Sequence, residues 1–406
     1  MPYTIWKQDQ AIWVIFQQLL TRGIIAVKFL LAAKILGPDK VGEFGIVLLS
    51  AAVIESVTDT GIQQAVIQST HSINRDQAGA VWTLQLARGA IAGLILFLLA
   101  TPISSFFGTP QTSAFLMVAA VILLTRCSVN PGVFLLQRNR NFRAQMFFES
   151  GASLIDLSIT LMLLMHDFGL AALLIGSLSG ESIRSLISWL WIRTEMSINI
   201  QWSVIKDFTD FGKWIWGSNI ITLVLNQTDK ALVAKFLGTH DFGLYQLASR
   251  VAQLIFSDAA NALSQYLFPT LSRKNRQSKA ETKVFLYSIL KITIPTVIIV
   301  CLLVALLSEY FITKFLGPSW LPSAALLNSL AIVMALGSII TILATYARAI
   351  GKPQYVTIAT FYQLLALILI APFLCYYFKA QGMIVAMGLA GIVTTVLISI
   401  KLKSHV

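Results

Sequence analysis

Polar and charged side chains recur at helical spacing inside strongly apolar stretches of this 406-residue chain. One set is Gln18, Thr21 and Lys28, with Arg22 beside it, and a second set, half a chain later, is Asn219, Thr222, Asn226 and Asp229. A shift of 201 residues (229 − 28) superimposes the two faces, which in the first copy take positions 18, 21, 25 and 28, and these positions step by three and four as on one side of a helix. A charge near the centre of a bilayer costs about 3 kcal/mol, so it usually faces a wet cavity or a partner. These faces therefore predict ligand binding or charge pairing.

A further polar stripe follows the second set. Its members are Gln246, Arg250, Gln253, Ser257, Asn261 and Ser264, with Asp258 beside them. Part of the stripe repeats earlier in the chain as Ser56, Thr60 and Gln63, next to Glu55 and Asp59. The repetition predicts one central cavity lined by both stripes. The alternative is that small and polar residues hold membrane helices together.

Other charges in apolar stretches raise the question of pairing. Glu181 and Arg184 are spaced i, i+3, so we expect them to neutralise each other on one helix. Arg88 and Arg126 have no obvious partner nearby in the sequence.

Nothing in the sequence predicts catalysis or a metal centre. Cys127, Cys301 and Cys375 lie in separate apolar stretches without metal-ligand or disulfide spacing. His166 and His240 are isolated, and no loop carries a nucleophile beside a base. We therefore expect a protein that is not an enzyme and has no cofactor other than, at most, a coupling ion, H⁺ or Na⁺.

The composition predicts an all-α integral membrane protein. The chain is 56% hydrophobic and 12% charged, with a mean hydropathy of +0.76, whereas soluble domains are about 25% charged. Its apolar runs are continuous and about 20 residues long, which suits membrane-spanning helices. We predict about twelve spans, at residues 12–36, 41–67, 78–101, 113–137, 145–165, 168–192, 213–237, 241–271, 284–306, 321–347, 354–377 and 382–400.

The basic residues predict how the chain crosses the membrane. With the N-terminus in the cytoplasm, the inner loops hold most of the Arg and Lys, including those of 138–143 and 273–283. The outer loops then hold little beyond Lys34, Lys40, Lys314 and Lys379. This positive-inside bias predicts that both termini are cytoplasmic. The net charge of +12 therefore reflects topology, with anionic lipid contact as a second role, and does not indicate nucleic-acid binding.

One sequence repeat predicts two lobes. The segment AKILGPDKVGEF at 33–44 recurs as AKFLGTHDFGLY at 234–245, again 201 residues apart. Six predicted spans separate the copies, which gives two six-helix lobes, 1–200 and 201–406, related by a pseudo-two-fold axis along the membrane normal. Residues 193–212 are the predicted cytoplasmic linker, with a helix along the membrane interface. Each copy contains a Leu-Gly pair, Leu36–Gly37 or Leu237–Gly238, which we call the LG turn. Each LG turn is expected to end a helix at the outer surface.

The chain also resembles a known family. The segments ILGPDKVGEFG, TDTGIQQAVIQ, NQTDKALVAKFLGTHDFGLYQLASR, LFPTLSR and KFLGPSW, in this order across nearly the whole chain, resemble the polysaccharide transporters of the MOP exporter superfamily. These are the O-antigen and exopolysaccharide repeat-unit flippases. The resemblance implies a MOP or MATE-like fold that works by alternating access. Its implied cargo is an oligosaccharide on undecaprenyl pyrophosphate, moved between leaflets of the bacterial inner membrane.

The resemblance also implies partners and site residues. The partners would be membrane lipids, a polysaccharide polymerase and chain-length proteins, with the protein itself a monomer. The family's cavity is cationic and lined by helices one, two, seven and eight, which carry the polar faces here. Cavity residues expected to bind cargo are Arg22, Lys28, Arg250, Gln18, Gln246, Gln253, Asn219 and Asn226. Residues expected in coupling or gating are Asp59, Asp229 and Asp258.

One specific gate and two other functions stay open at this point. Lys28 and Asp229 hold equivalent positions and could pair as an outer gate, or each could pair within its own lobe. A MATE-like multidrug exporter driven by Na⁺ or H⁺ is the main alternative function. The candidate bases (Arg22, Lys28, Arg250) roughly match the acids, which favours an anionic lipid over organic cations. A membrane polymerase or ligase would need a large outer catalytic loop, and every predicted outer loop is short.

Overall fold

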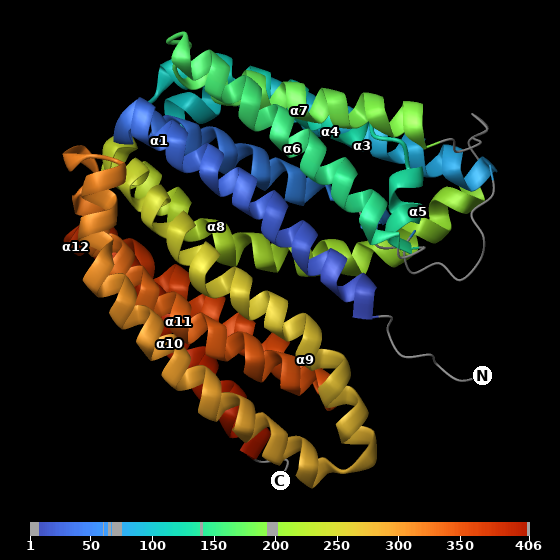
Figure 1. The fold of residues 1–406 in the computed structure, drawn as a ribbon, viewed down its shortest axis with the longest axis vertical. Helices are drawn as coiled ribbons and strands as arrows, with labels where there is room; N and C mark the ends of the chain where they lie inside the picture. Colours follow the sequence, from blue (N-terminus) through green and yellow to red (C-terminus); the bar gives the residue numbers. More distant parts are fainter. Residues whose placement is uncertain are drawn as a thin grey trace. The chain divides into compact units, whose positions relative to one another are not determined.

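The computed structural model describes residues 8–59, 61–63, 66, 75–138, 141–192 and 202–403, and every regular element in these ranges is helical (Figure 1). Inside the helices, the side chains of residues 8–15, 19, 137, 138, 142, 202–219, 221, 222 and 403 lie outside the described set. The predicted all-α class is confirmed.

The helices overlap the predicted spans, but the span 113–137 is divided between two helices and the span 241–271 is divided at a π-helical turn. They are α1 (Gln8–Thr58), α3 (Arg75–Phe106), α4 (Ser113–Cys127), α5 (Gly132–Arg138), α6 (Phe142–Met165), α7 (Leu170–Trp191), α8 (Trp202–Ala252), α9 (Asp258–Gln277), α10 (Lys279–Phe315), α11 (Pro322–Ala349) and α12 (Pro353–Lys403). Short 3₁₀ turns precede α4 and α11. Within the described ranges, seven helices are long and apolar enough to cross a membrane: α3, α4 with its preceding turn, α6, α7, α10, α11 and α12.

Three long helices each join two predicted spans at a kink: α12 contains both of its spans, whereas α1 and α8 end inside the second of theirs, 41–67 and 241–271. The backbone leaves helical geometry at Gly37 in α1 (φ 77°), Gly238 in α8 (φ 80°) and Lys379 in α12 (φ 53°). Glycine adopts a positive φ at little cost because it lacks a Cβ. The two LG turns found in the sequence therefore mark the bends of α1 and α8.

The chain divides into two compact units, residues 1–36 with 43–223 and residues 37–42 with 224–406. The predicted lobe boundary at residue 200 stays a prediction, because residues 193–201 lie outside the described part of the chain. Residues 202–212, predicted to lie along the interface, form the first turns of α8.

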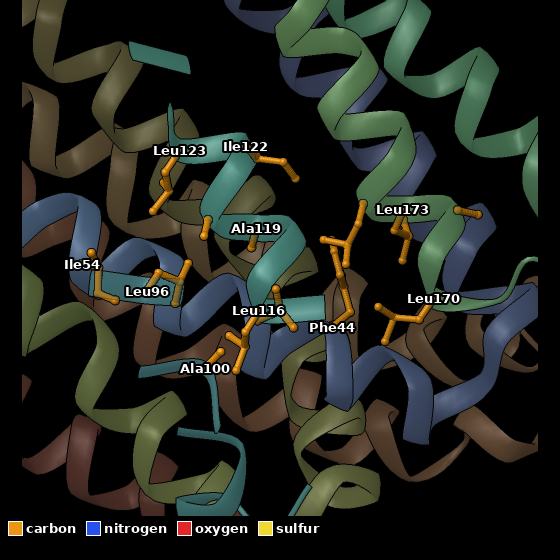
Figure 2. Close-up of a cluster of buried hydrophobic side chains, with 14 of the residues drawn as sticks. Phe44, Ile54, Leu96, Ala100, Leu116, Ala119, Ile122, Leu123, Leu170 and Leu173 are labelled. Atoms are coloured by element: carbon orange, nitrogen blue, oxygen red, sulfur yellow. The ribbon is translucent and has the colours of Figure 1, made fainter. Parts of the chain in front are cut away.

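The core of the first unit brings α1, α3, α4 and α7 together. Figure 2 shows Phe44 of α1, Leu96 of α3, Leu116 of α4 and Leu173 of α7 directed into one cluster. All four side chains are buried. The helix α6 then packs along α7. This packing holds the polar residues described below at fixed separations.

The second unit is built around α11. This helix packs on α9, α10 and α12, and its buried Ile342, Leu343 and Tyr346 join a core with Leu267 and Leu271 of α9. The 3₁₀ turn before it buries Trp320 completely.

The two LG turns contact each other within the second unit. A Cβ on Gly42 would overlap the carbonyl oxygen of Thr239, and a Cβ on Gly243 would overlap that of Pro38. Next to these contacts, Asp39 Oδ2 lies 3.1 Å from His240 Nδ1. Gly42 and Gly243, Pro38 and Thr239, and Asp39 and His240 are each 201 residues apart. The two copies of the repeat therefore meet through equivalent residues.

Candidate functional site: polar residues inside the helical units

Lys28 is buried in the first unit and bonds to two other helices. Its Nζ donates to both carboxylate oxygens of Asp156 on α6, at 2.7 and 2.8 Å, and to the Ser177 hydroxyl on α7 at 2.9 Å. The Lys28 side chain is 10% exposed. An ammonium group has three donors, and all three are used here. Lys28 thus has its partner within its own unit, which is the arrangement weighed from the sequence against the outer gate.

Two glycines bring α7 close to Asp156. A Cβ on Gly176 would overlap the Thr160 hydroxyl, and a Cβ on Gly180 would lie 2.8 Å from Asp156 Cβ. Small residues four positions apart allow membrane helices to approach closely. The Thr160 hydroxyl also donates to Asp156 Oδ1 at 3.2 Å. The seam between α6 and α7 therefore fixes the carboxylate that receives Lys28.

A chain of alternating charges links four helices of the same unit. Arg184 of α7 donates to Glu149 of α6 at 2.8 Å and to Glu181 of its own helix at 3.2 Å. Arg126 of α4 donates to Glu181 at 2.9 Å and to Glu55 of α1 at 2.8 Å. The predicted Glu181–Arg184 pair is confirmed. The side chains of this charge chain are 16–40% exposed, so it connects the four helices at a partly buried position.

Arg88 of α3 ties down the end of α1. Its Nη1 lies 3.3 Å from Asp59 Oδ1, and its Nη2 donates to the Glu55 carbonyl at 3.1 Å. Arg88 and Arg126, which have no obvious partner in the sequence, both find partners on other helices. Beside this contact lies a cavity of about 300 Å³, whose polar lining comes from Glu55, Ser56, Asp59, Gln63, Gln85 and Arg88.

Asp229 is buried in the second unit beside a neutral partner. The Tyr245 hydroxyl donates to Asp229 Oδ2 at 2.7 Å and lies 3.4 Å from the Met387 sulfur. Asp229 is 4% exposed, and its Oδ1 has no hydrogen-bond partner among the described residues. A buried carboxylate without a cation is costly when ionised. Its geometry therefore suits the uptake of a proton or a cation.

The second polar stripe is interrupted by a π-helical turn at Gln253–Ser257, between α8 and α9. The extra residue rotates the later positions by about 100° relative to an α-helix. Ser257, the last residue of the turn, has its hydroxyl 3.9 Å from the Met334 sulfur, and beyond the turn Ser264 hydrogen-bonds to Thr345 of α11. These two hydroxyls thus pack against α11, which is the packing alternative expected from the sequence.

The remaining predicted residues differ in their exposure. Half-buried are Gln18, Arg22, Gln246, Arg250, Gln253 and Asp258, whereas Asn226 is exposed. The Gln246 Oε1 atom is buried without a hydrogen-bond partner among the described residues. The side chain of Asn219 lies outside the described residues. Whether these residues jointly line a central cavity stays a prediction.

Sequence reasoning did not assign three residues that the structure makes prominent. Asp156 and Ser177 lie 128 and 149 positions from Lys28, a separation that no helical periodicity can bridge. Tyr245 could have been singled out from the sequence, because it is the aromatic residue that ends the second copy of the repeat, as Phe44 ends the first.

A sequence profile of the family described as "Polysaccharide biosynthesis protein" matches residues 31–325. The chain belongs to this family. The match includes the Arg–Glu chain of the first unit and the Asp229–Tyr245 pair of the second. The resemblance to MOP-superfamily polysaccharide transporters is confirmed.

Known members of the polysaccharide biosynthesis group are distant but similar over much of the chain. ExoT, the succinoglycan biosynthesis transport protein of Rhizobium meliloti, is 21% identical over 84% of this chain and 68% of its own length. WzxC, a lipopolysaccharide biosynthesis protein of Escherichia coli, is 21% identical over 84% and 67%. TuaB, a teichuronic acid biosynthesis protein of Bacillus subtilis, is 20% identical over 68% and 57%. The matches thus span from just over half to about two thirds of these relatives.

Solved structures show the same fold. The lipid II flippase MurJ, in an inward closed conformation, matches with a TM-score of 0.78 over 97% of this chain and 87% of MurJ, at 15% identity. An inward-facing MATE multidrug transporter of the MOP superfamily matches with a TM-score of 0.71 over 99% of this chain and 97% of its own, at 14% identity. This family member is therefore a multi-pass membrane protein with the MOP fold.

Proposed function

We propose that the protein is a flippase that translocates an undecaprenyl-pyrophosphate-linked oligosaccharide repeat unit from the cytoplasmic to the outer leaflet by alternating access. The observation that carries this proposal is the family match over residues 31–325. It is supported by a fold like that of a lipid II flippase and by a relative named for transport in succinoglycan biosynthesis.

Embedded charge and amide groups suit such a cargo. A pyrophosphate cannot cross hydrocarbon unaided, and arginine offers it two parallel charge-assisted bonds. Arg22 and Arg250 are half-buried on or beside the predicted polar faces, and we assign them to the pyrophosphate. The predicted cavity amides would bind the sugar.

Coupling to an ion is assigned to Asp229 in preference to Asp59. Asp59 faces Arg88 at 3.3 Å, so its charge is already balanced. Among the described side chains, the one hydrogen bond that Asp229 accepts comes from the neutral Tyr245 hydroxyl. Binding of H⁺ or Na⁺ there would offset the cost of the buried carboxylate.

The proposed setting is the bacterial inner membrane with both termini in the cytoplasm. The distribution of Arg and Lys supports this orientation. A polymerase and chain-length proteins acting on the outer leaflet are the proposed partners.

Flipping can be tested with the full chain in reconstituted vesicles. A polyprenyl-pyrophosphate oligosaccharide placed in the inner leaflet should become accessible to an external lectin, and protein-free vesicles provide the baseline. Arg250→Gln should abolish this accessibility and Arg250→Lys should restore it only in part. If the vesicles flip no lipid-linked sugar but move organic cations along an imposed Na⁺ or H⁺ gradient, the MATE-like exporter replaces the flippase.

A further inference from the structure

The cavity of about 300 Å³ in the first unit lies between the end of α1 and the middle of α3. Arg88 forms part of its wall and already donates one nitrogen toward Asp59 and another to the Glu55 carbonyl. These contacts hold the guanidinium in place at the cavity wall. The cavity is therefore a built feature and not a gap between loosely packed helices.

Two buried polar atoms of this wall lack partners among the described residues. They are the Gln85 Oε1 atom, an acceptor, and the Arg88 Nε atom, a donor. The residues are three positions apart on α3, so both side chains lie on one face of the helix. Buried polar groups in native proteins are almost always hydrogen-bonded. A group that both donates and accepts, such as a ligand hydroxyl or a water, would satisfy both atoms.

The charges of the lining do not favour a phosphate. Asp59 faces Arg88, and Glu55 is paired with Arg126 of α4, so these groups have no net positive charge to attract an anion. Hydroxyl groups satisfy both unpartnered atoms without adding charge. Ala52 and Ile62 add an apolar part to the same wall, and a sugar ring combines apolar C–H faces with a hydroxyl-bearing edge.

We propose that this cavity is a subsite for one neutral or amino-bearing sugar ring of the cargo, held by Gln85 and Arg88. The assignment rests on the proposed flippase function for the source of the sugar. The volume is at the lower end for ligand pockets, roughly 300–1,000 Å³, so it takes one ring and not a whole repeat unit. The pyrophosphate is bound elsewhere.

The test uses the purified full chain in detergent and saturation-transfer difference NMR. The probes are hexoses, N-acetylhexosamines and deoxyhexoses, with inorganic pyrophosphate as the competitor. Wild type should transfer saturation to at least one sugar, and pyrophosphate should not displace it. Gln85→Leu should weaken binding about tenfold by removing one buried hydrogen bond. Ala52→Leu should abolish binding by filling the cavity.

Gln145→Leu is the matched control, because the Gln145 Oε1 atom on α6 is also buried without a described partner but does not line the cavity. It should bind as wild type does. The subsite is wrong if no sugar binds to wild type, if pyrophosphate displaces the sugar, or if Gln85→Leu and Gln145→Leu behave alike.

The vesicle assay separates this subsite from the flippase proposal. Cavity-dependent sugar binding without flipping would leave the subsite standing and remove the flippase. If the protein flips the lipid-linked sugar but Gln85→Leu and Ala52→Leu leave sugar binding unchanged, the flippase stands and the subsite is wrong.

Discussion

Removal of the Asp156 carboxylate should destabilise the first unit by about 3 kcal/mol. Asp156→Ala deletes two of the three bonds of the Lys28 ammonium, those of 2.7 and 2.8 Å. At the upper limit measured for hydrogen bonds between membrane helices, about 1.7 kcal/mol each, the loss is about 3 kcal/mol. The cost of breaking a buried pair, about 3–5 kcal/mol, gives the same lower bound.

The measurement is unfolding in mixed detergent micelles, followed by circular dichroism. Asp39→Ala is the control, because Asp39 also bonds one partner, His240, but is 62% exposed. It should change stability by less than about 1 kcal/mol. The double variant Lys28→Met, Asp156→Leu should recover most of the loss, since apolar residues often replace a buried pair without cost.

Two results would refute this reasoning. Asp156→Ala could match the Asp39→Ala control, or the double variant could be as unstable as Asp156→Ala alone. The double variant also reports on cargo. A stable double variant that still flips cargo at the wild-type rate would remove Lys28 from the predicted cargo-binding residues.

Three further changes test other parts of the structure. Gly176→Ala should lower stability or yield because its Cβ would overlap a neighbouring hydroxyl, whereas Gly151→Ala on α6 meets nothing within 4 Å and should unfold as wild type does. Arg126→Leu should reduce stability by about 1–2 kcal/mol in the same unfolding assay, a loss moderated by solvent at a side chain that is 40% exposed. An increase in stability would contradict its role in the charge chain. Asp229→Asn should make flipping in vesicles indifferent to imposed H⁺ and Na⁺ gradients while Tyr245→Phe keeps the response, and a gradient response retained by Asp229→Asn would exclude coupling there.

Local sequence spacing predicted the contacts and bends that depend on the geometry of a single helix. The Glu181–Arg184 pair follows from i, i+3 geometry on one helix and is present at 3.2 Å. Likewise, α1 and α8 bend at Gly37 and Gly238, because glycine adopts a positive φ at little energetic cost wherever it occurs in the chain. The twelve predicted spans rest on the same kind of local signal.

Partners on different helices could not be predicted from spacing. Lys28 finds Asp156 across 128 residues, and this depends on the approach of α6 and α7 at Gly176 and Gly180. The π-helical turn at Gln253–Ser257 also could not be predicted from spacing. Because of its extra residue, the polar positions after the turn no longer lie on the same helical face as those before it.

The contact between the LG turns bears on how a doubled chain arises. In a dimer of identical subunits, a residue on the two-fold axis meets its own copy, because such an interface is isologous. Asp39 and His240 occupy such equivalent positions and lie 3.1 Å apart. In an ancestor with identical halves, acid would have faced acid or imidazole would have faced imidazole. An acid opposite an imidazole requires that the two copies differ, which is possible because both lie in one chain.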